Sequence, residues 1–290
     1  MNGAEWFRLK AARDKIAAIE STVAAFLHST ESLAWPICPG RDIETREGYM
    51  HPPKPKLSSQ DGQGRLLHDV ANIELQAMEL AVRTLGEYPE APRGFREELA
   101  DLAVQEAKHL RLCLDAMDEI DRPWGTWPIH LALWEQAPLK TASRTNLIER
   151  IFVVHRHMEG SGLDAGSAIL TRLSGVGRTR AKAVVQLILK EEVDHVAFGT
   201  KWYRALCLSE GLDPDSRFAE LLPSALAKSP RTEKLDMELR RKAGFSESEI
   251  QCLLRTQSGV STVGGDAVEA VAEVPLRVVE GGYSRERVLQ

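Results

Sequence analysis

Two Glu-x-x-His motifs carry the residue types and the spacing that could do chemistry in this chain. They are Glu106-x-x-His109 and Glu192-x-x-His195. Residues three positions apart on an α-helix lie on one face, so each motif would project a carboxylate and an imidazole together. Such a pair can bind one metal ion or two adjacent ions. A single motif of this kind is a weak signal, because glutamate is frequent here.

Two further carboxylates strengthen the signal. Glu74 precedes Glu106 by 32 residues and Glu159 precedes Glu192 by 33, each within an apolar segment of helical spacing. A carboxylate on the core-facing side of a helix is costly unless it is paired or bound to metal. The alternative is that Glu74 lies at the edge of its apolar stripe, where it would be an ordinary solvated side chain. We predict that one site for two metal ions is formed by Glu74, Glu106, His109, Glu159, Glu192 and His195.

Two adjacent glutamates in the second motif could each be the metal ligand. Glu191 is a rival for Glu192, because positions i and i+4 also share a helix face and Glu191 would then face His195. The parallel between Gln105-Glu106 in the first motif and Glu191-Glu192 in the second favours Glu192. We therefore expect Glu192 to be the ligand.

Other polar residues could hydrogen-bond to the metal ligands from outside the site. His155 precedes Glu159 by one helical turn and shares its face, which makes it a candidate outer partner or an extra ligand. His157 points elsewhere on a helical projection and is expected to face solvent. Gln105, Glu191 and Asp194 are the remaining candidates for outer partners of the ligands.

Four segments with helical spacing of apolar residues must position these side chains. The third helix is expected to end near Glu159, because glycines follow it. The short loop 86–93 makes the first two helices antiparallel neighbours. The long connection 121–140 contains three tryptophans, predicted to be buried by packing, and serves as a crossover along the molecule. The predicted helices are 66–85, 94–117, 142–159 and 178–208.

The rest of the chain adds elements around this all-α core. One helix over 4–27 is expected to pack on the outside, followed by a strap rich in proline and glycine that is either docked or a linker. Shorter helices are predicted over 216–226, 232–242 and 244–254. We divide the chain into an N-terminal helix and strap (1–64), a four-helix core (65–210), a helical extension (211–255) and a disordered tail (256–290).

Composition narrows the class of protein. The 290 residues carry a formal net charge of −5 and a pI near 6.0, which argues against a broad surface for nucleic acid. The four cysteines form no Cys-x-x-Cys pair, as expected in a reducing compartment. We see neither a signal peptide nor an apolar run long enough to cross a membrane. The sequence predicts a cytoplasmic protein without nucleic-acid or membrane partners.

These residues resemble the ferritin-like superfamily, and in particular the bacterial group named domain of unknown function 455. The resemblance covers roughly 38–254 and includes both Glu-x-x-His motifs. Its other motifs are Pro39-Gly40-Arg41, Leu67-His68 to Ile73-Glu74, Met158-Glu159-x-x-Gly162-Leu163-Asp164 and Lys242-Ala243-Gly244-Phe245-Ser246-Glu247. In one departure, the group often has Glu-Ala-Arg-Gly-Leu-Asp where this chain has glycine and serine at 160 and 161, which makes a substrate harder to infer.

The resemblance implies a ferritin-like four-helix bundle with one long crossover and a dinuclear site. Glu106 and Glu192 would bridge the ions, and each histidine would cap one of them. Glu74 and Glu159 would be terminal ligands. The expected cofactor is two iron ions, with manganese or a mixed iron and manganese pair as alternatives.

The function that the resemblance implies is an O2-dependent oxidase or hydroxylase of a small organic substrate, with electrons from an external donor. Chain beyond the bundle could wall off a substrate pocket. One alternative is a ferroxidase or iron-handling protein, and another is a metal-free helical interaction module. A tRNA hydroxylase is a special case, which the acidic chain disfavours. The sequence is also compatible with a homodimer.

Overall fold

The computed structural model of this chain is all-helical, as predicted. An isolated bridge between Thr45 and Ile129 is the sole β pairing among the described residues. No described helix is both long enough and apolar enough to span a membrane. The structure describes residues 3–28, 36–47, 50–137, 142–177, 179–229 and 233–257.

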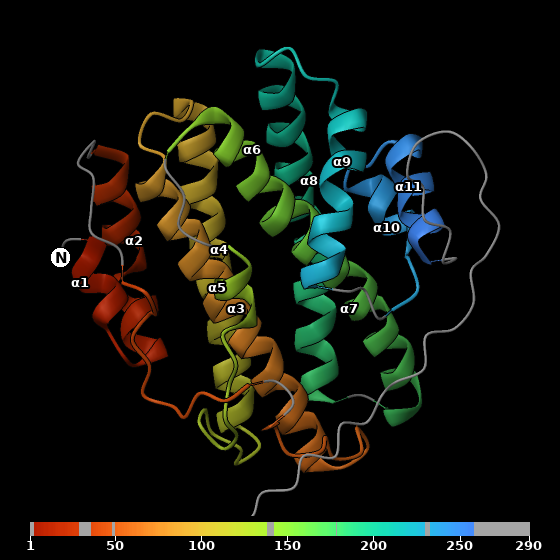
Figure 1. Ribbon diagram of the computed structural model, residues 1–290. Helices are drawn as coiled ribbons and strands as arrows, with labels where there is room; N and C mark the ends of the chain where they lie inside the picture. The colour runs from red at the N-terminus through yellow and green to blue at the C-terminus, as the bar shows by residue number, and fades with distance from the viewer. Residues whose placement is uncertain are drawn as a thin grey trace, which may run out of the picture.

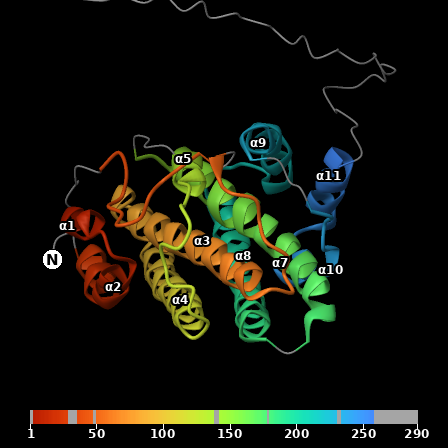
Figure 2. The same cartoon turned by 90° about the horizontal axis from the view of Figure 1, so that it is seen from below.

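Four long helical segments lie side by side at the centre of the molecule (Figures 1 and 2). α3 packs along α4, and both α4 and α7 pack against α8. The third segment is continuous but changes type along its length, from α6 through the π-helix η2 to α7. The bounds are α3 Gln60–Glu87, α4 Arg93–Asp118, α6 Arg144–Ile151, η2 Phe152–Met158, α7 Glu159–Leu173 and α8 Arg180–Ser209.

The third segment extends further than predicted. The glycines after Glu159 do not end the helix, which continues as α7 to Leu173. Gly160 shows why, since a Cβ there would lie 2.4 Å from Nη1 of Arg240. This glycine makes room for a packed neighbour, and that contact outweighs its low helix propensity.

α3 begins at Gln60 instead of at residue 66. Ser59 caps it, because its Oγ accepts a hydrogen bond of 3.0 Å from the backbone N–H of Gly62. A Cβ at Gly62 would lie 1.9 Å from the carbonyl oxygen of Lys56. The glycine that argued against a helix here is therefore needed where the strap crosses the first turn of α3.

The N-terminal segment forms two helices instead of the single one predicted, α1 (Gly3–Arg8) and α2 (Ala12–His28). α2 packs against α3 and α4. Lys15 of α2 and Arg41 of the strap both pair with Glu79 of α3, each at 2.5 Å, and all three side chains are buried. The strap around Arg41 is therefore docked on α3. Residues 29–35 and 48–49 lie outside the described residues.

The crossover is held on α3 by two amide side chains, and Asn72 donates to the carbonyl oxygen of His130. Gln76 donates to the carbonyl oxygen of His130 and accepts hydrogen bonds from the backbone N–H groups of Leu133 and Trp134. Trp134, in the short helix α5 (Ala132–Gln136), is buried and donates to the carbonyl oxygen of Ile37. This tryptophan packs in the core as predicted for the crossover, whereas Trp124 and Trp127 are only partly buried.

Of three C-terminal helices, the first two pack against η2, α7 and α8, and the third packs on those two (Figure 1). They are α9 (Pro214–Lys228), α10 (Met237–Lys242) and α11 (Glu247–Gln257). α11 includes Thr256 and Gln257, so the predicted start of the tail at 256 is wrong by two residues. The remainder of that prediction, 258–290, lies outside the described residues.

Candidate metal centre

The two Glu-x-x-His motifs face each other across the contact between α4 and α8. Oε1 of Glu192 lies 3.2 Å from Nδ1 of His109 and 3.2 Å from Nδ1 of His195. Glu106 approaches the same two nitrogens, at 2.9 Å for His195 and 3.7 Å for His109. One ligand atom from each of these four residues lies within 4.8 Å of the others. The structure therefore brings the two motifs together.

The remaining two glutamates reach the same place from α3 and α7. Oε2 of Glu74 lies 3.6 Å from Nδ1 of His109. Glu159, the first residue of α7, lines one cavity together with Glu74, Glu106 and Glu192. The four glutamates thus border one cavity, and the two histidines contact three of them.

Buried atoms without partners mark this space. Glu106, His109 and His195 are at most 2% exposed. A buried polar atom without a hydrogen bond destabilises the fold, and native proteins leave few of them. A cation would satisfy these carboxylate oxygens and imidazole nitrogens together, so the donor set fits a metal. Among the described residues the atoms without a hydrogen bond include both oxygens of Glu106, Oε2 of Glu159, Oε1 of Glu192 and Nδ1 of His109 and of His195.

The outer nitrogen of each histidine is held by a neighbouring oxygen. Nε2 of His109 lies 2.9 Å from Oε2 of Glu191, and Nε2 of His195 lies 3.1 Å from Oε1 of Gln105. An acceptor at Nε2 favours a proton there, so Nδ1, which faces the carboxylates, could give its lone pair to a metal ion. Lys108 in turn holds Glu191 at 2.8 Å. Glu191 thus lies behind His109, whereas Glu192 lies between the two imidazoles.

The π-helix η2 leads directly into Glu159. Nδ1 of His155 lies 2.7 Å from Oε1 of Glu159, so His155 holds that carboxylate as expected. His157 was expected to face solvent, but it is buried and its Nε2 bonds to the carbonyl oxygen of Ser229 at 2.8 Å. A π-helix has more residues per turn than an α-helix, so an α-helical projection places His157 wrongly.

Asp194 is the candidate outer partner that the structure does not place at the centre. Its side chain is exposed on α8, one position before His195. Adjacent residues on a helix point in different directions, and no contact within the described part of the chain joins Asp194 to the cluster. Of the predicted outer partners, Gln105, His155 and Glu191 contact a ligand candidate, whereas Asp194 does not.

The carboxylates of the cluster have pKa values that are shifted in opposite directions. Burial raises the pKa of Glu74 and of Glu159, although neighbouring histidines act against it. Burial also acts to raise the pKa of Glu106, but the charges of His195 and His109 outweigh it and lower that pKa. Burial opposes charge on His195, yet Glu106 and Glu192 raise its pKa well above the usual range. Like charges around one space would raise every carboxylate pKa, but the pKa of Glu106 is lowered because this carboxylate pairs with two imidazoles.

Gly199 sets the distance between α8 and η2, a role that sequence reasoning missed. It lies one helical turn after His195, and a Cβ at this position would lie 2.5 Å from Cβ of His155. The close approach of the two helices therefore depends on glycine here. Its spacing from His195 was a signal, but the contact with His155 is visible only in the fold.

We expect Gly199→Ala to destabilise the protein by about 1–3 kcal/mol, because the added methyl forces apart two packed helices. Urea unfolding followed by circular dichroism measures the change. Gly162→Ala is the matched control on α7, where a Cβ would meet no atom within 4 Å. That control should gain about 0.5–1 kcal/mol, since alanine favours a helix interior. Equal stabilities of the two variants would contradict the assigned role of Gly199.

Comparison with known proteins places the chain among proteins without a described activity. The family described as "Protein of unknown function (DUF455)" matches residues 8–251. The chain is also similar to an uncharacterized protein of Haemophilus influenzae, with 27% identity over 218 residues. That similarity covers 71% of this chain and 72% of the Haemophilus protein. No solved structure matches the chain significantly.

Proposed function

We propose that this chain, which belongs to the family described as "Protein of unknown function (DUF455)", is a ferritin-like protein with a dinuclear metal site. Its function would be the O2-dependent oxidation or hydroxylation of a small organic molecule. The observation that carries the proposal is the set of buried, inward-facing oxygens and nitrogens that lack hydrogen bonds between α4, α7 and α8.

Charge balance favours two ions over one. Glu74, Glu106, Glu159 and Glu192 border one cavity and would carry four negative charges when ionised. Two divalent cations offset four charges, whereas one cation would leave two buried carboxylates uncompensated, which is costly. Mixed oxygen and nitrogen donors suit iron or manganese. The proposed cofactor is therefore two iron ions, with manganese or a mixed pair as alternatives.

Geometry suggests a role for each ligand candidate. Glu106 and Glu192 each approach both Nδ1 atoms, as bridging carboxylates would. The imidazole rings of His109 and His195 have centroids 5.3 Å apart, so each could serve a separate ion. Glu74 lies beside His109 and would be a terminal ligand there. Glu159 would be the terminal ligand on the other side of the site.

The chain's own residues orient the site and control its protons. A bound pair of redox-active ions supplies electron transfer to O2. Hydroxylation of a C–H bond then consumes one O2, two electrons from an external donor and two protons, and yields an alcohol and water. Gln105 and Glu191 fix the imidazole rings, and His155 holds a proton between its Nδ1 and Oε1 of Glu159. This arrangement keeps the four carboxylates aimed at one space.

Metal titration of the full chain tests the proposal. Protein stripped with a chelator and loaded anaerobically with Fe(II) should hold about two ions per chain. Free metal at a hundredfold excess over its Kd should add about 2.7 kcal/mol to the free energy of unfolding. Loaded protein should then consume O2 when a reductant is supplied. Failure to bind metal, or binding without any rise in stability, would overturn the site.

Size-exclusion chromatography separates the proposal from an iron-handling role. A ferroxidase that stores iron would assemble into a closed cage of many subunits and turn over Fe(II) itself. The proposed enzyme should elute as a monomer or a small oligomer. Elution as a large cage that consumes O2 only while Fe(II) is oxidised would contradict the small-molecule function.

A further inference from the structure

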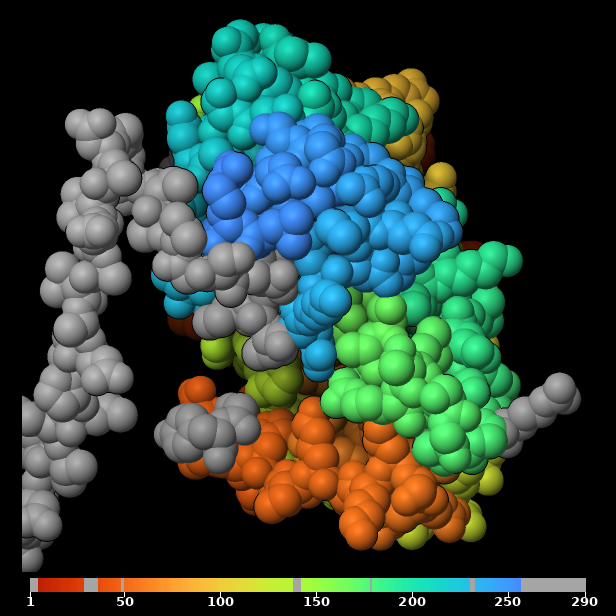
Figure 3. Space-filling view, turned by 90° about the vertical axis from the view of Figure 1, so that its right-hand side faces the viewer, coloured from red at the N-terminus to blue at the C-terminus, as the bar shows by residue number. Residues whose placement is uncertain are grey.

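A cavity of about 310 Å³ adjoins the candidate metal centre. The carboxylates of Glu74, Glu106, Glu159 and Glu192 lie along it, and its walls come from α3, η2, α7 and α8. Ile73 lines the cavity and is 43% exposed, so the cavity reaches the surface beside α3. Figure 3 shows the face on which α3 (orange), α7 (green) and the C-terminal helices (blue) meet. The volume of the cavity falls at the lower end of the range for small-molecule sites, roughly 300–1,000 Å³.

The walls of this cavity are mostly apolar. Beyond the four carboxylates they consist largely of aliphatic side chains, methionine, alanine and glycine. No lysine, arginine or histidine lies among the described residues that line it. A ligand with a phosphate or another anionic group would find no countercharge on these walls, and burying it would be costly. Representative wall residues are Val70, Leu80, Val154, Met158, Ile169 and Ile188.

Of the four other polar residues on the walls, three are engaged elsewhere, and the fourth is Ser229. Oγ of Ser161 donates to the carbonyl oxygen of His157, at 2.7 Å. Asp164 pairs with Arg240, also at 2.7 Å, and Glu233 contacts Arg172. These groups have partners and are poorly placed to bind a polar ligand. The carboxylates of the metal centre are therefore the main polar feature that a ligand would meet.

Small residues on α7 create the space. Gly162, Ala165 and Gly166 all line the cavity, and they share one face of the helix at positions i, i+3 and i+4. A Cβ at Gly162 would meet no atom within 4 Å. The helix at this position therefore borders open volume instead of a packed neighbour, and a side chain added there would occupy the cavity.

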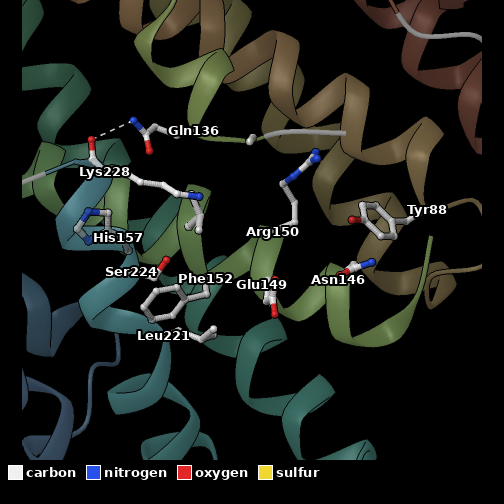
Figure 4. Close-up of a pocket in the computed structure, with 13 residues that line it drawn as sticks. Tyr88, Gln136, Asn146, Glu149, Arg150, Phe152, His157, Leu221, Ser224 and Lys228 are labelled. Carbon is white, nitrogen blue, oxygen red and sulfur yellow. Dashed lines mark hydrogen bonds between the residues drawn. The ribbon is translucent and has the colours of Figure 1, made fainter. Parts of the chain in front are cut away.

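A second cavity has a different character. It measures about 110 Å³ and none of the candidate metal ligands lines it (Figure 4). Polar groups from Asn146, Arg150, His157 and Lys228 border it, and Arg150 already pairs with buried Glu87 at 2.7 Å. The larger cavity alone combines an apolar interior with access to the four carboxylates, which identifies it as the better ligand site.

The geometry points to the larger cavity as the binding site of the organic substrate, and to an uncharged molecule with an apolar body as that substrate. This inference rests on the proposed function, in which two bound cations offset the four carboxylates, and the apolar character of the ligand follows from the walls. The apolar body lies against α3, η2, α7 and α8, and the reacting carbon lies at the end bordered by Glu106 and Glu192. Burial of the apolar body supplies the binding energy.

Calorimetric titration of the full chain, loaded with Mn(II), tests this inference with probes of similar length. The probe 1-octanol should bind in the cavity, whereas triethylene glycol and AMP should not. Gly162→Phe should weaken octanol binding by at least about tenfold, because the ring occupies the cavity, and should leave metal content unchanged. Thr171→Leu is the matched control on the outer face of α7 and should bind octanol like the wild type.

Circular dichroism shows whether Gly162→Phe is folded, and Ala165→Leu replaces it if it is not. Octanol binding that is equally strong in the wild type and in a folded cavity-filling variant would overturn the inference. Stronger binding of AMP or triethylene glycol than of octanol would do the same. A chain that binds octanol in the cavity but no metal would overturn the proposed function instead, and would leave the ligand class intact.

Discussion

Glu192→Ala should weaken metal binding at both positions together and abolish O2 consumption. Oε1 of Glu192 lies 3.2 Å from the inward nitrogen of each histidine, so this carboxylate is placed to contact both of the proposed ions. Removal of a bridge leaves each ion a ligand short and weakens the geometry that O2 chemistry at a metal pair requires. Bound metal should fall from about two ions per chain to one or none. Metal analysis after dialysis, together with an oxygen electrode, measures both effects.

The adjacent glutamate provides a matched control. Glu191→Ala removes a carboxylate of similar exposure to water from the same turn of α8, but this one holds the outer nitrogen of His109. Loss of such an outer partner typically costs 10–100-fold in metal affinity, so saturating metal should still fill both positions. Metal loss in Glu191→Ala together with full retention in Glu192→Ala would show that the ligand assignment is off by one residue. Retention in both variants would place the metal elsewhere.

Local spacing explains why so much of the candidate site could be predicted. Glu106 and His109 share a face of any α-helix through their positions, and Glu192 and His195 do the same. Glu74 interrupts an apolar stripe, and a carboxylate on the buried side of a helix is costly unless it is paired or bound to metal. These inferences need one helix at a time. The pairing of the helices then follows from short loops and one long crossover.

Features that depend on contacts between distant segments could not be predicted. Gly160 weakens an isolated helix, but in the fold it makes room for Arg240, which follows it by 80 positions. His157 is buried because α9 covers η2, and its Nε2 bonds to the carbonyl oxygen of Ser229 just beyond α9. Asp194 has the right chemistry for an outer partner yet lies on the exposed side of α8. In each case contacts between distant segments determine where the side chain lies, and one sequence alone does not show those contacts.

Asp164→Ala should destabilise the protein by about 3–5 kcal/mol, because it leaves a buried guanidinium without its partner. Oδ2 of Asp164 pairs with Nη2 of Arg240 at 2.7 Å, and both side chains are at most 2% exposed. Oδ1 also accepts a hydrogen bond of 2.8 Å from the backbone N–H of Asp236 at the start of α10. Asp164 thus ties the C-terminal helices to α7. Chemical denaturation of the full chain measures the loss.

Two further variants separate this structural role from a role in the metal centre. Arg172→Ala breaks a partly exposed pair with Glu233 and should cost no more than about 1 kcal/mol. Asp164→Ala combined with Arg240→Met removes both buried charges and should recover part of the lost stability. Asp164 lies five residues beyond Glu159, and its hydrogen bonds run to Asp236 and Arg240 instead of to the metal ligands. Folded Asp164→Ala should therefore keep its metal, and a variant of wild-type stability that loses metal would place Asp164 among the ligands.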